Sequence, residues 1–203
     1  MGYPPLMARK PTYHHGDLRR TLLDSSLALL EEKGLAGLSL REVARRAGVT
    51  HQAPYHHFAD RAAILAALAD EGFALLLASM QAEQEKAHRA PGAQLAAAGR
   101  GYVNFALAHP AHFRLMFRPE LCEGAPPSVA GAAAYGLLVD AVAAAQKGGE
   151  APPQDSETLV ALCWSAVHGL ASLFLDGPMA AADPKRAARK MMALLVRLLA
   201  AGS

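Results

Sequence analysis

The chain has 203 residues, of which 52% are hydrophobic and 19% are charged, and its formal net charge is +2. It is long enough to bury a core, and its leucine and alanine content without alternating β-branched residues predicts an all-α soluble protein. Two unpaired cysteines, Cys122 and Cys163, exclude a disulfide-rich framework and fit a reducing, cytoplasmic compartment. No basic segment followed by an apolar core opens the chain, so we expect no signal peptide.

Positive charge gathers in the first third of the chain. Residues 1–62 hold nine Lys and Arg against six Asp and Glu, together with five histidines, whereas residues 63–203 hold eleven against twelve. A basic segment on an otherwise neutral chain is the electrostatic footprint expected of a protein that binds DNA phosphates. The first twelve residues contain three prolines and two cations without periodicity, which predicts a disordered basic arm over residues 1–12. Whether Met1 or Met7 is the natural start stays open.

Residues 13–62 predict a three-helix unit. A first helix runs over residues 17–33 and ends at Gly34. Ser39 and Glu42 form a capping box that begins the second helix, and Gly48 ends it in a left-handed turn. Thr50 is expected to cap a short third helix with an exposed polar face. Helix, glycine turn and polar helix make a helix-turn-helix, whose second member can enter a DNA major groove.

Residues 63–203 predict a larger helical domain, because proline, glycine and capping residues divide them into apolar segments. With the helix that starts near residue 60, the segments predict helices over residues 60–87, 93–108, 128–146, 155–175 and 183–200, and one from Pro110 that stops at Pro119. The whole chain is therefore expected to contain about nine helices.

The segment from Thr158 to Leu175 contains no Asp, Glu, Lys or Arg, which raises the possibility of a membrane span. It is barely long enough and is bounded at once by Glu157 and Asp176, so we expect a buried helix of a soluble protein. Small residues form a ridge on it, and the last helix carries an apolar stripe. Two such helices from each of two subunits would form a four-helix bundle, which predicts a homodimer. The expected interface residues are Ala161, Ser165, Gly169, Ser172, Ala188, Met191, Met192, Leu195, Leu198 and Leu199.

Trp164 and His168 lie one helical turn apart and therefore share a face. They are either plain core residues or part of a small-molecule pocket, and their apolar company favours a pocket. The expected lining is Tyr102, Phe113, Met116, Phe117, Trp164 and His168. Such a pocket suits a hydrophobic or aromatic effector rather than an anion.

Catalytic and metal sites are not predicted. The histidine pairs and trios at residues 14–15, 51 and 56–57 have no Cys or carboxylate at ligand spacing, and no nucleophile and base stand at interpretable spacing. We therefore expect no metal, no cofactor and no enzymatic activity.

The segment YHHGDLRRTLLDSSLALLEEKGLAGLSLREVARRAGVTHQAPYHHFADRAAIL, Tyr13 to Leu65, resembles the DNA-binding domain of the tetracycline-repressor (TetR) family of bacterial transcription regulators. WSAVHG at residues 164–169, preceded by HPAHFRLMF at residues 109–117, is similar to a regulatory domain known for its Trp-His-Gly motif. The resemblance implies an all-helical homodimer that binds a palindromic operator and responds to a small molecule. Repression is the family's habit, while an activator and an architectural DNA binder without an effector remain alternatives.

The same resemblance implies which residues touch DNA. Arg41 and the residues after Gly48 would reach base edges or phosphates, with Gln52 suited to adenine, and Arg61 would hold a phosphate. Pro54 departs from the family pattern and is expected to shorten the recognition helix. The full expected set is Ser39, Arg41, Thr50, His51, Gln52, Ala53, Tyr55, His56, His57 and Arg61.

Overall fold

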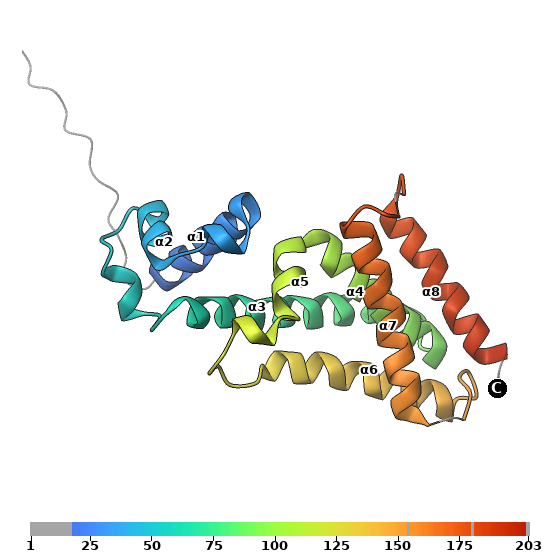
Figure 1. Ribbon diagram of the computed structural model, residues 1–203. Coiled ribbons are helices and arrows are strands. Elements are labelled where there is room, and N and C mark those ends of the chain that lie inside the picture. The colour runs from blue at the N-terminus through green and yellow to red at the C-terminus, as the bar shows by residue number, and fades with distance from the viewer. Residues whose placement is uncertain (1–17, 154, 180, 202–203) are drawn as a thin grey trace, which may run out of the picture. The chain divides into compact units, whose positions relative to one another are not determined.

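The computed structural model describes residues 18–153, 155–179 and 181–201, and the expected arm over residues 1–12 lies outside them (Figure 1). Within the described part the chain is all-helical, with eight α-helices and three short 3₁₀ turns, which confirms the predicted fold class. The chain divides into two compact units, Met1–Ile64 and Leu65–Ser203. The boundary falls inside α3 (Arg61–Glu85), two residues beyond the boundary predicted from the sequence.

The first unit is built from α1 (Leu18–Lys33), η1 (Leu35–Gly37), α2 (Leu40–Ala47) and η2 (Ala53–His56). The Ser39 hydroxyl accepts the N–H of Glu42 at 3.2 Å, so the predicted cap is present. The Glu42 carboxylate pairs instead with Arg45, at 3.1 Å, and with Lys33, at 3.6 Å. Gly48 ends α2 with φ of 69°, the left-handed conformation that its missing side chain permits.

The segment after Gly48 differs from its prediction. It forms the 3₁₀ turn η2 instead of a ninth α-helix, and Gln52, not Thr50, stands at its N-cap without a side-chain cap bond. The Thr50 carbonyl still accepts the N–H of Ala53 at 3.0 Å. Pro54 explains the short element, because it has no N–H to continue an α-helical ladder at this position. The recognition helix, which Pro54 is predicted to shorten, is therefore reduced to a single 3₁₀ turn.

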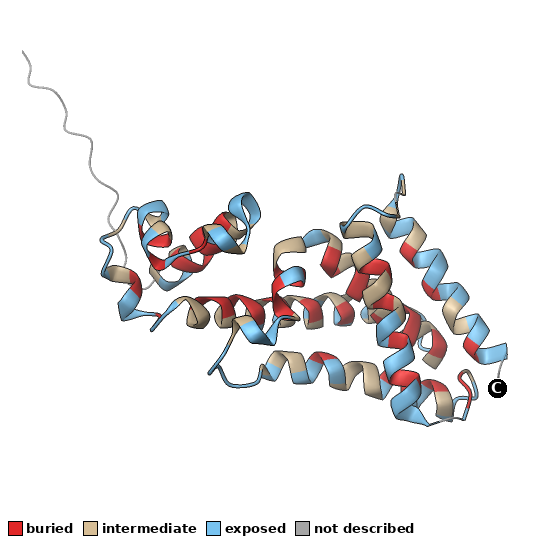
Figure 2. Ribbon diagram, viewed as in Figure 1, coloured by how far each residue is buried: buried red, intermediate tan, exposed pale blue. Residues whose placement is uncertain are grey.

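The second unit surrounds α4 (Pro91–Ala108), which packs against α6 (Val129–Lys147), α7 (Ser156–Leu175) and α8 (Pro184–Ala201) (Figure 1). Two short elements, α5 (Pro110–Met116) and η3 (Pro119–Leu121), follow α4. Polar caps begin three of the helices: the N–H groups of Gly131, Thr158 and Arg186 bond to Ser128, Asp155 and Asp183. Buried side chains line the inner faces of these helices, and α8 is largely exposed on its outer side (Figure 2).

Gly101 lets α4 lie directly against α3. A Cβ atom at this position would stand 2.5 Å from the Cα of Met80 and 2.6 Å from the carbonyl oxygen of Ser79. The Ser79 hydroxyl donates to the Gly101 carbonyl at 2.8 Å, which ties the two helices at the same place. A side chain larger than hydrogen would therefore push the two backbones apart.

Three helices, α3, α6 and α7, are long and apolar enough to cross a membrane by length and composition alone. In the structure their apolar residues contribute to a packed interior. Buried residues of α7, including Leu159, Val160 and Cys163, pack with Leu95 of α4 and Val142 of α6. The apolar character of α7 is therefore accounted for on one side by burial within the second unit.

Candidate DNA-binding surface and ligand cavity

The polar residues that follow Gly48 are presented on the surface of the first unit. His51, Gln52, His56 and His57 are exposed, and Tyr55 is 54% exposed although it is a large aromatic residue. Gln52 lies beside His51, with their side-chain nitrogens 3.3 Å apart. Ala53 is half-buried, and Thr50 and Ser39 are exposed. The exposed Tyr55 side chain is surrounded by hydrogen-bond donors and acceptors, so it is available to a binding partner and is not needed to fill the core.

Two residues of the same segment face inward and anchor it. Pro54 is fully buried and Phe58 is 4% exposed. The Arg19 guanidinium carbon lies 5.3 Å from the centre of the Phe58 ring, a cation–π contact from α1. The carbonyl of Pro54 accepts the N–H groups of both His57 and Phe58, at 3.0 and 2.9 Å. The buried Pro54 and Phe58 thus hold this single turn against the first unit, while the polar residues beside them stay exposed.

The arginines of α2 have separate roles. Arg46 makes two hydrogen bonds of 2.7 Å to Glu32 of α1, and this guanidinium holds the pKa of the Glu32 carboxyl below its ordinary value. Arg45 pairs with Glu42 one turn away. Arg41, the residue expected to contact DNA, is exposed. Arg46 therefore joins α2 to α1, and Arg45 forms an ion pair within α2.

Arg61 contributes to the fold of the first unit. It is half-buried, and one of its terminal nitrogens donates to the carbonyl of Leu35 at 2.7 Å. That bond joins the start of α3 to the η1 turn inside the first unit. Arg61 therefore helps to hold the fold of the first unit, and its expected contact with a DNA phosphate stays a prediction.

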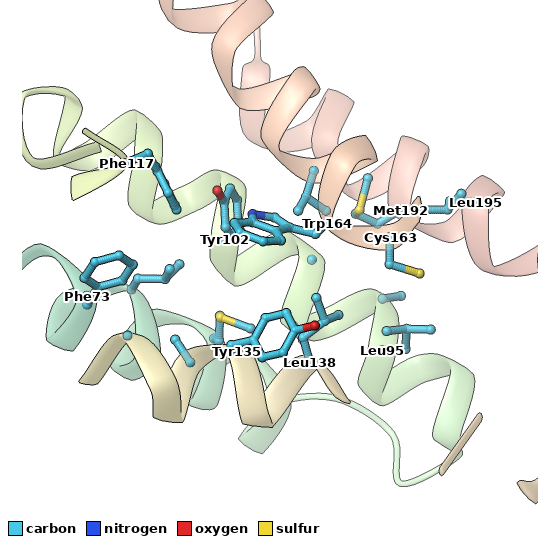
Figure 3. Close-up of a pocket in the computed structure, with 18 of the residues that line it drawn as sticks. Phe73, Leu95, Tyr102, Phe117, Tyr135, Leu138, Cys163, Trp164, Met192 and Leu195 are labelled. Carbon is cyan, nitrogen blue, oxygen red and sulfur yellow. The ribbon is translucent and has the colours of Figure 1, made fainter. Parts of the chain in front are cut away.

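A cavity of about 340 Å³ lies inside the second unit (Figure 3). Residues of α3, α4, α6, α7 and α8 form its wall, so no single helix defines it. Its volume is within the range of small-molecule sites in proteins. The lining residues are Phe73, Leu76, Met80, Leu95, Ala96, Ala98, Gly99, Tyr102, Phe117, Ser128, Gly131, Ala134, Tyr135, Leu138, Cys163, Trp164, Val167, Met192, Leu195 and Val196.

Of the six pocket residues expected from the sequence, Tyr102, Phe117 and Trp164 line this cavity. Phe113, Met116 and His168 do not line it. Phe113 and Met116 are buried, and the ring centres of Phe113 and His168 are 5.1 Å apart. These residues form a layer behind the side chains that line the cavity. The aromatic cluster expected from the sequence is present, with the Phe117 and Trp164 rings 6.1 Å apart. The cavity itself opens on the side of the cluster that faces α3, α6 and α8.

Sequence reasoning missed the contribution of α6. Tyr135 and Leu138 of this helix line the cavity, and the Tyr135 ring lies 6.0 Å from that of Trp164 (Figure 3). Alanine dominates α6, so its pattern gave no sign of which face is turned to a cavity. Tyr135 was the available signal, as a large aromatic residue in an otherwise small-residue helix.

A polar cluster lies at the back of the cavity. The Tyr102 hydroxyl is 2.8 Å from Nδ1 of His168, within hydrogen-bond distance. Burial raises the pKa of the Tyr102 hydroxyl and lowers the pKa of the His168 imidazole. Burial also raises the pKa of the Cys163 thiol. All three groups therefore stay uncharged at neutral pH.

The expected dimer residues fall into two groups. On α7, Ala161 and Ser165 are exposed, and Gly169 and Ser172 are half-buried. On α8, Met191 and Leu198 are exposed, and Leu195 is half-buried and lines the cavity. Ala188, Met192 and Leu199 are buried inside the chain itself, because their stripe of α8 turns toward the interior of the unit. These three are core residues and leave the expected interface.

Other apolar residues replace them on the outer surface. Leu162 and Leu173 of α7 are 50% and 41% exposed, and Leu194 of α8 is 48% exposed. Met191, Leu194 and Leu198 recur at helical spacing and form one apolar stripe. The sequence prediction included Met191 and Leu198 of this stripe but missed Leu194, and it also took in three residues of α8 that face the interior of their own subunit.

Both parts of the chain match a known family. Residues 22–68 match the bacterial regulatory proteins of the tetR family, and residues 95–197 match the tetracyclin repressor-like C-terminal domain. The chain belongs to the TetR family. This membership confirms the resemblance found in residues 13–65, while the Trp-His-Gly subtype of the second domain stays a prediction.

Three similar proteins illustrate the extent of the likeness. The HTH-type transcriptional regulator AcrR of Shigella flexneri is 42% identical over 55 residues, 27% of this chain and 26% of AcrR. An uncharacterised HTH-type transcriptional regulator of Haemophilus influenzae is 33% identical over 101 residues, 49% of each chain. The matches thus span a quarter and about half of these two relatives. A solved structure from Rhodococcus sp. RHA1, of unknown function, is 38% identical with a TM-score of 0.79, covering 94% of this chain and 100% of that one.

Proposed function

We propose that this protein is a ligand-responsive, sequence-specific DNA-binding transcriptional regulator, and that a small hydrophobic effector releases it from its operator. The observation that carries the proposal is the presence, in one TetR-family chain, of an exposed polar helix-turn-helix surface and an apolar cavity. The surface would bind the operator, and the cavity would bind the small molecule that controls operator binding. The family fold favours a DNA-binding regulator over an enzyme.

The DNA contacts follow from the exposed residues of the first unit. Arg41 can bond bidentately to guanine and Gln52 to adenine, while the half-buried Ala53 can touch a thymine methyl. Tyr55 and the exposed histidines around it are suited to phosphate oxygens or base edges. Because the element that presents them is one turn long, few bases per half-site can be read. We expect a short recognition sequence in each half-site.

A homodimer would supply the second half-site. The exposed apolar stripe of α8 and the small-residue ridge of α7 offer two helices from each subunit to a four-helix interface. A two-fold dimer places two equivalent recognition elements on a palindromic operator, with half-sites about 34–36 Å apart. We propose that the protein acts in the cytoplasm, where its DNA target is found.

The effector would act by shifting a population. A ligand that fits the cavity better in one arrangement of the second unit favours that arrangement. If the favoured arrangement separates the two recognition elements by a different distance, both cannot occupy successive major grooves, and the operator is released. A purely architectural DNA binder would have no use for the cavity. An activator would share every feature except the direction of the effect on transcription.

Selection of the purified full chain on random duplex DNA tests this function. We expect a palindromic winning sequence, bound with an affinity that falls steeply as salt is raised, because cationic side chains displace counterions from phosphates. Affinity for the winner is then measured with and without apolar compounds that occupy the cavity. Absence of any enriched sequence would contradict the proposal, and a winner whose affinity no cavity ligand changes would contradict the effector part alone.

A further inference from the structure

The cavity carries no charged lining residue among the residues that the structure describes. Five of its lining side chains are polar or weakly polar: Tyr102, Ser128, Tyr135, Cys163 and Trp164. A carboxylate or ammonium group transferred into such a wall would lose its hydration without gaining a counterion, which costs several kcal/mol. The wall therefore selects against charged ligands.

Most of these polar groups are already engaged. The Ser128 hydroxyl accepts the N–H of Gly131 at 2.9 Å and donates to Asp70. The Cys163 thiol is a weak donor and acceptor. Tyr135 is 46% exposed and so belongs partly to the surface. The Tyr102 hydroxyl is different, because Tyr102 is buried, belongs to the wall, and is hydrogen bonded to His168 of α7.

The Tyr102 hydroxyl and Nδ1 of His168 share one hydrogen bond. A neutral imidazole carries a proton on only one of its nitrogens, so Nδ1 either donates to the Tyr102 oxygen or accepts from the Tyr102 hydroxyl. If Nδ1 of His168 donated to the same oxygen, the Tyr102 proton would face an apolar cavity without an acceptor, at a cost of about 1–3 kcal/mol. If the Tyr102 O–H donates to Nδ1 instead, at 2.8 Å, its proton is satisfied. The bond therefore runs from the Tyr102 hydroxyl to Nδ1 of His168.

This direction leaves the Tyr102 oxygen free to accept a hydrogen bond. Resting on the proposed ligand response, we infer that the natural ligand is an uncharged, mainly apolar molecule with one hydroxyl group, which donates a hydrogen bond to the Tyr102 oxygen. Tyr102 is then the specificity-determining residue, and His168 is a positioning residue that keeps the Tyr102 proton turned away from the ligand. The remaining wall, with flexible Met80 and Met192, adapts to the apolar body of the ligand.

The fluorescence of Trp164 gives a direct assay, because it is the one tryptophan of the chain and belongs to the cavity wall. The probes are two matched pairs, decanol with its methyl ether and thymol with its methyl ether, together with decanoate. Each ether keeps the oxygen and the apolar body but lacks the donor proton. We expect at least one alcohol to bind about tenfold more tightly than its ether, and decanoate to bind more weakly than decanol.

Three variants test whether the preference for an alcohol over its ether depends on Tyr102. Tyr102→Phe removes the acceptor, so the alcohol and its ether should bind with affinities within about twofold of each other. Tyr135→Phe, which alters the other tyrosine of the wall, should keep the full preference. His168→Leu frees the Tyr102 proton to donate to a ligand, so affinity for the ether should rise, an effect that general loosening of the fold would not produce.

The outcomes separate this inference from the proposed function. Equal affinity of alcohols and ethers for the unaltered protein, loss of the preference in Tyr135→Phe, tighter binding of decanoate, or no response of Trp164 to any probe would each overturn the inference. An alcohol preference that disappears in Tyr102→Phe supports it, whether or not DNA is released. If the preference is found and affinity for the selected operator is unchanged, the effector part of the proposed function fails while the assignment of Tyr102 stands.

Discussion

Pro54 shows how one residue shapes the DNA-facing surface. It is fully buried, has no N–H to donate, and its carbonyl accepts two successive N–H groups from His57 and Phe58. The residues on either side of it, Ala53 and Tyr55, are held half-buried and exposed, respectively. Pro54 thus shortens the recognition element and, through its own burial, also fixes that element to the core.

Substitutions at Gln52 and Tyr55 should separate base readout from phosphate contact. Gln52→Ala removes a bidentate adenine partner, so preference at one position of each half-site should relax by roughly 1–3 kcal/mol. Tyr55→Phe removes one hydroxyl, so it should weaken binding to all sequences alike. The measurement is affinity of each variant for the selected operator and for single-base variants of it. Equal effects on preference by both substitutions would contradict this division.

Arg61 should act through stability. Arg61→Ala leaves the Leu35 carbonyl without its charged donor, so the free energy of unfolding should fall by roughly 1–2 kcal/mol. The matched control is Arg41→Ala, an exposed arginine of the same unit, which should change the free energy of unfolding by less than about 0.5 kcal/mol. Urea unfolding followed by circular dichroism measures both. Lower DNA affinity of Arg61→Ala at unchanged stability would contradict this structural role and favour the phosphate contact instead.

Within the helical elements, the positions of the helix ends and the contacts between helices depend on different features of the sequence. The ends follow local chemistry, as the caps at Ser39, Ser128, Asp155 and Asp183 show. The contacts depend on where small residues meet, and Gly101 is the clearest case because both atoms nearest to its absent side chain belong to the backbone of α3.

Replacing Gly101 should test that contact. Alanine usually stabilises a helix relative to glycine by about 1 kcal/mol, but at this position its Cβ would collide with the backbone at Met80. Gly101→Ala should therefore lower the free energy of unfolding by roughly 1–3 kcal/mol. Gly136→Ala is the matched control, because nothing lies within 4 Å of a Cβ built at that helical position. A stabilised Gly101→Ala protein would show that the close approach is unnecessary.

For the whole molecule, the exposed apolar stripe of α8 is the feature that one chain does not explain. Met191, Leu194 and Leu198 are between 39% and 63% exposed, at helical spacing. Contiguous apolar surface of this kind indicates an interaction site. The small-residue ridge of α7 offers a second face of the same kind, and a second copy of the chain supplies both surfaces at once.

A charge in this stripe should separate the subunits. In a two-fold dimer Leu198→Glu buries a carboxylate in each copy, so the protein should sediment as a monomer at micromolar concentration and lose its operator affinity. Val129→Glu is the control, since Val129 is 83% exposed and lies outside α7 and α8. Analytical ultracentrifugation measures both. A dimeric Leu198→Glu protein with unchanged operator affinity would place the interface elsewhere.

The sequence by itself determined the α-helices and the cap at Ser39, because these depend on residues close together in the chain. The segment after Gly48 is the exception, since it forms a 3₁₀ turn without the predicted Thr50 cap. Ser39 and Gly48 bound α2 through a side-chain bond and a left-handed turn, and both signals can be read locally. Only the tertiary structure decided that Arg61 serves the fold, which stripe of α8 is buried, and that the cavity lies between five helices. Each of these depends on which distant residues meet, and helical periodicity gives a face without naming the neighbour that covers it.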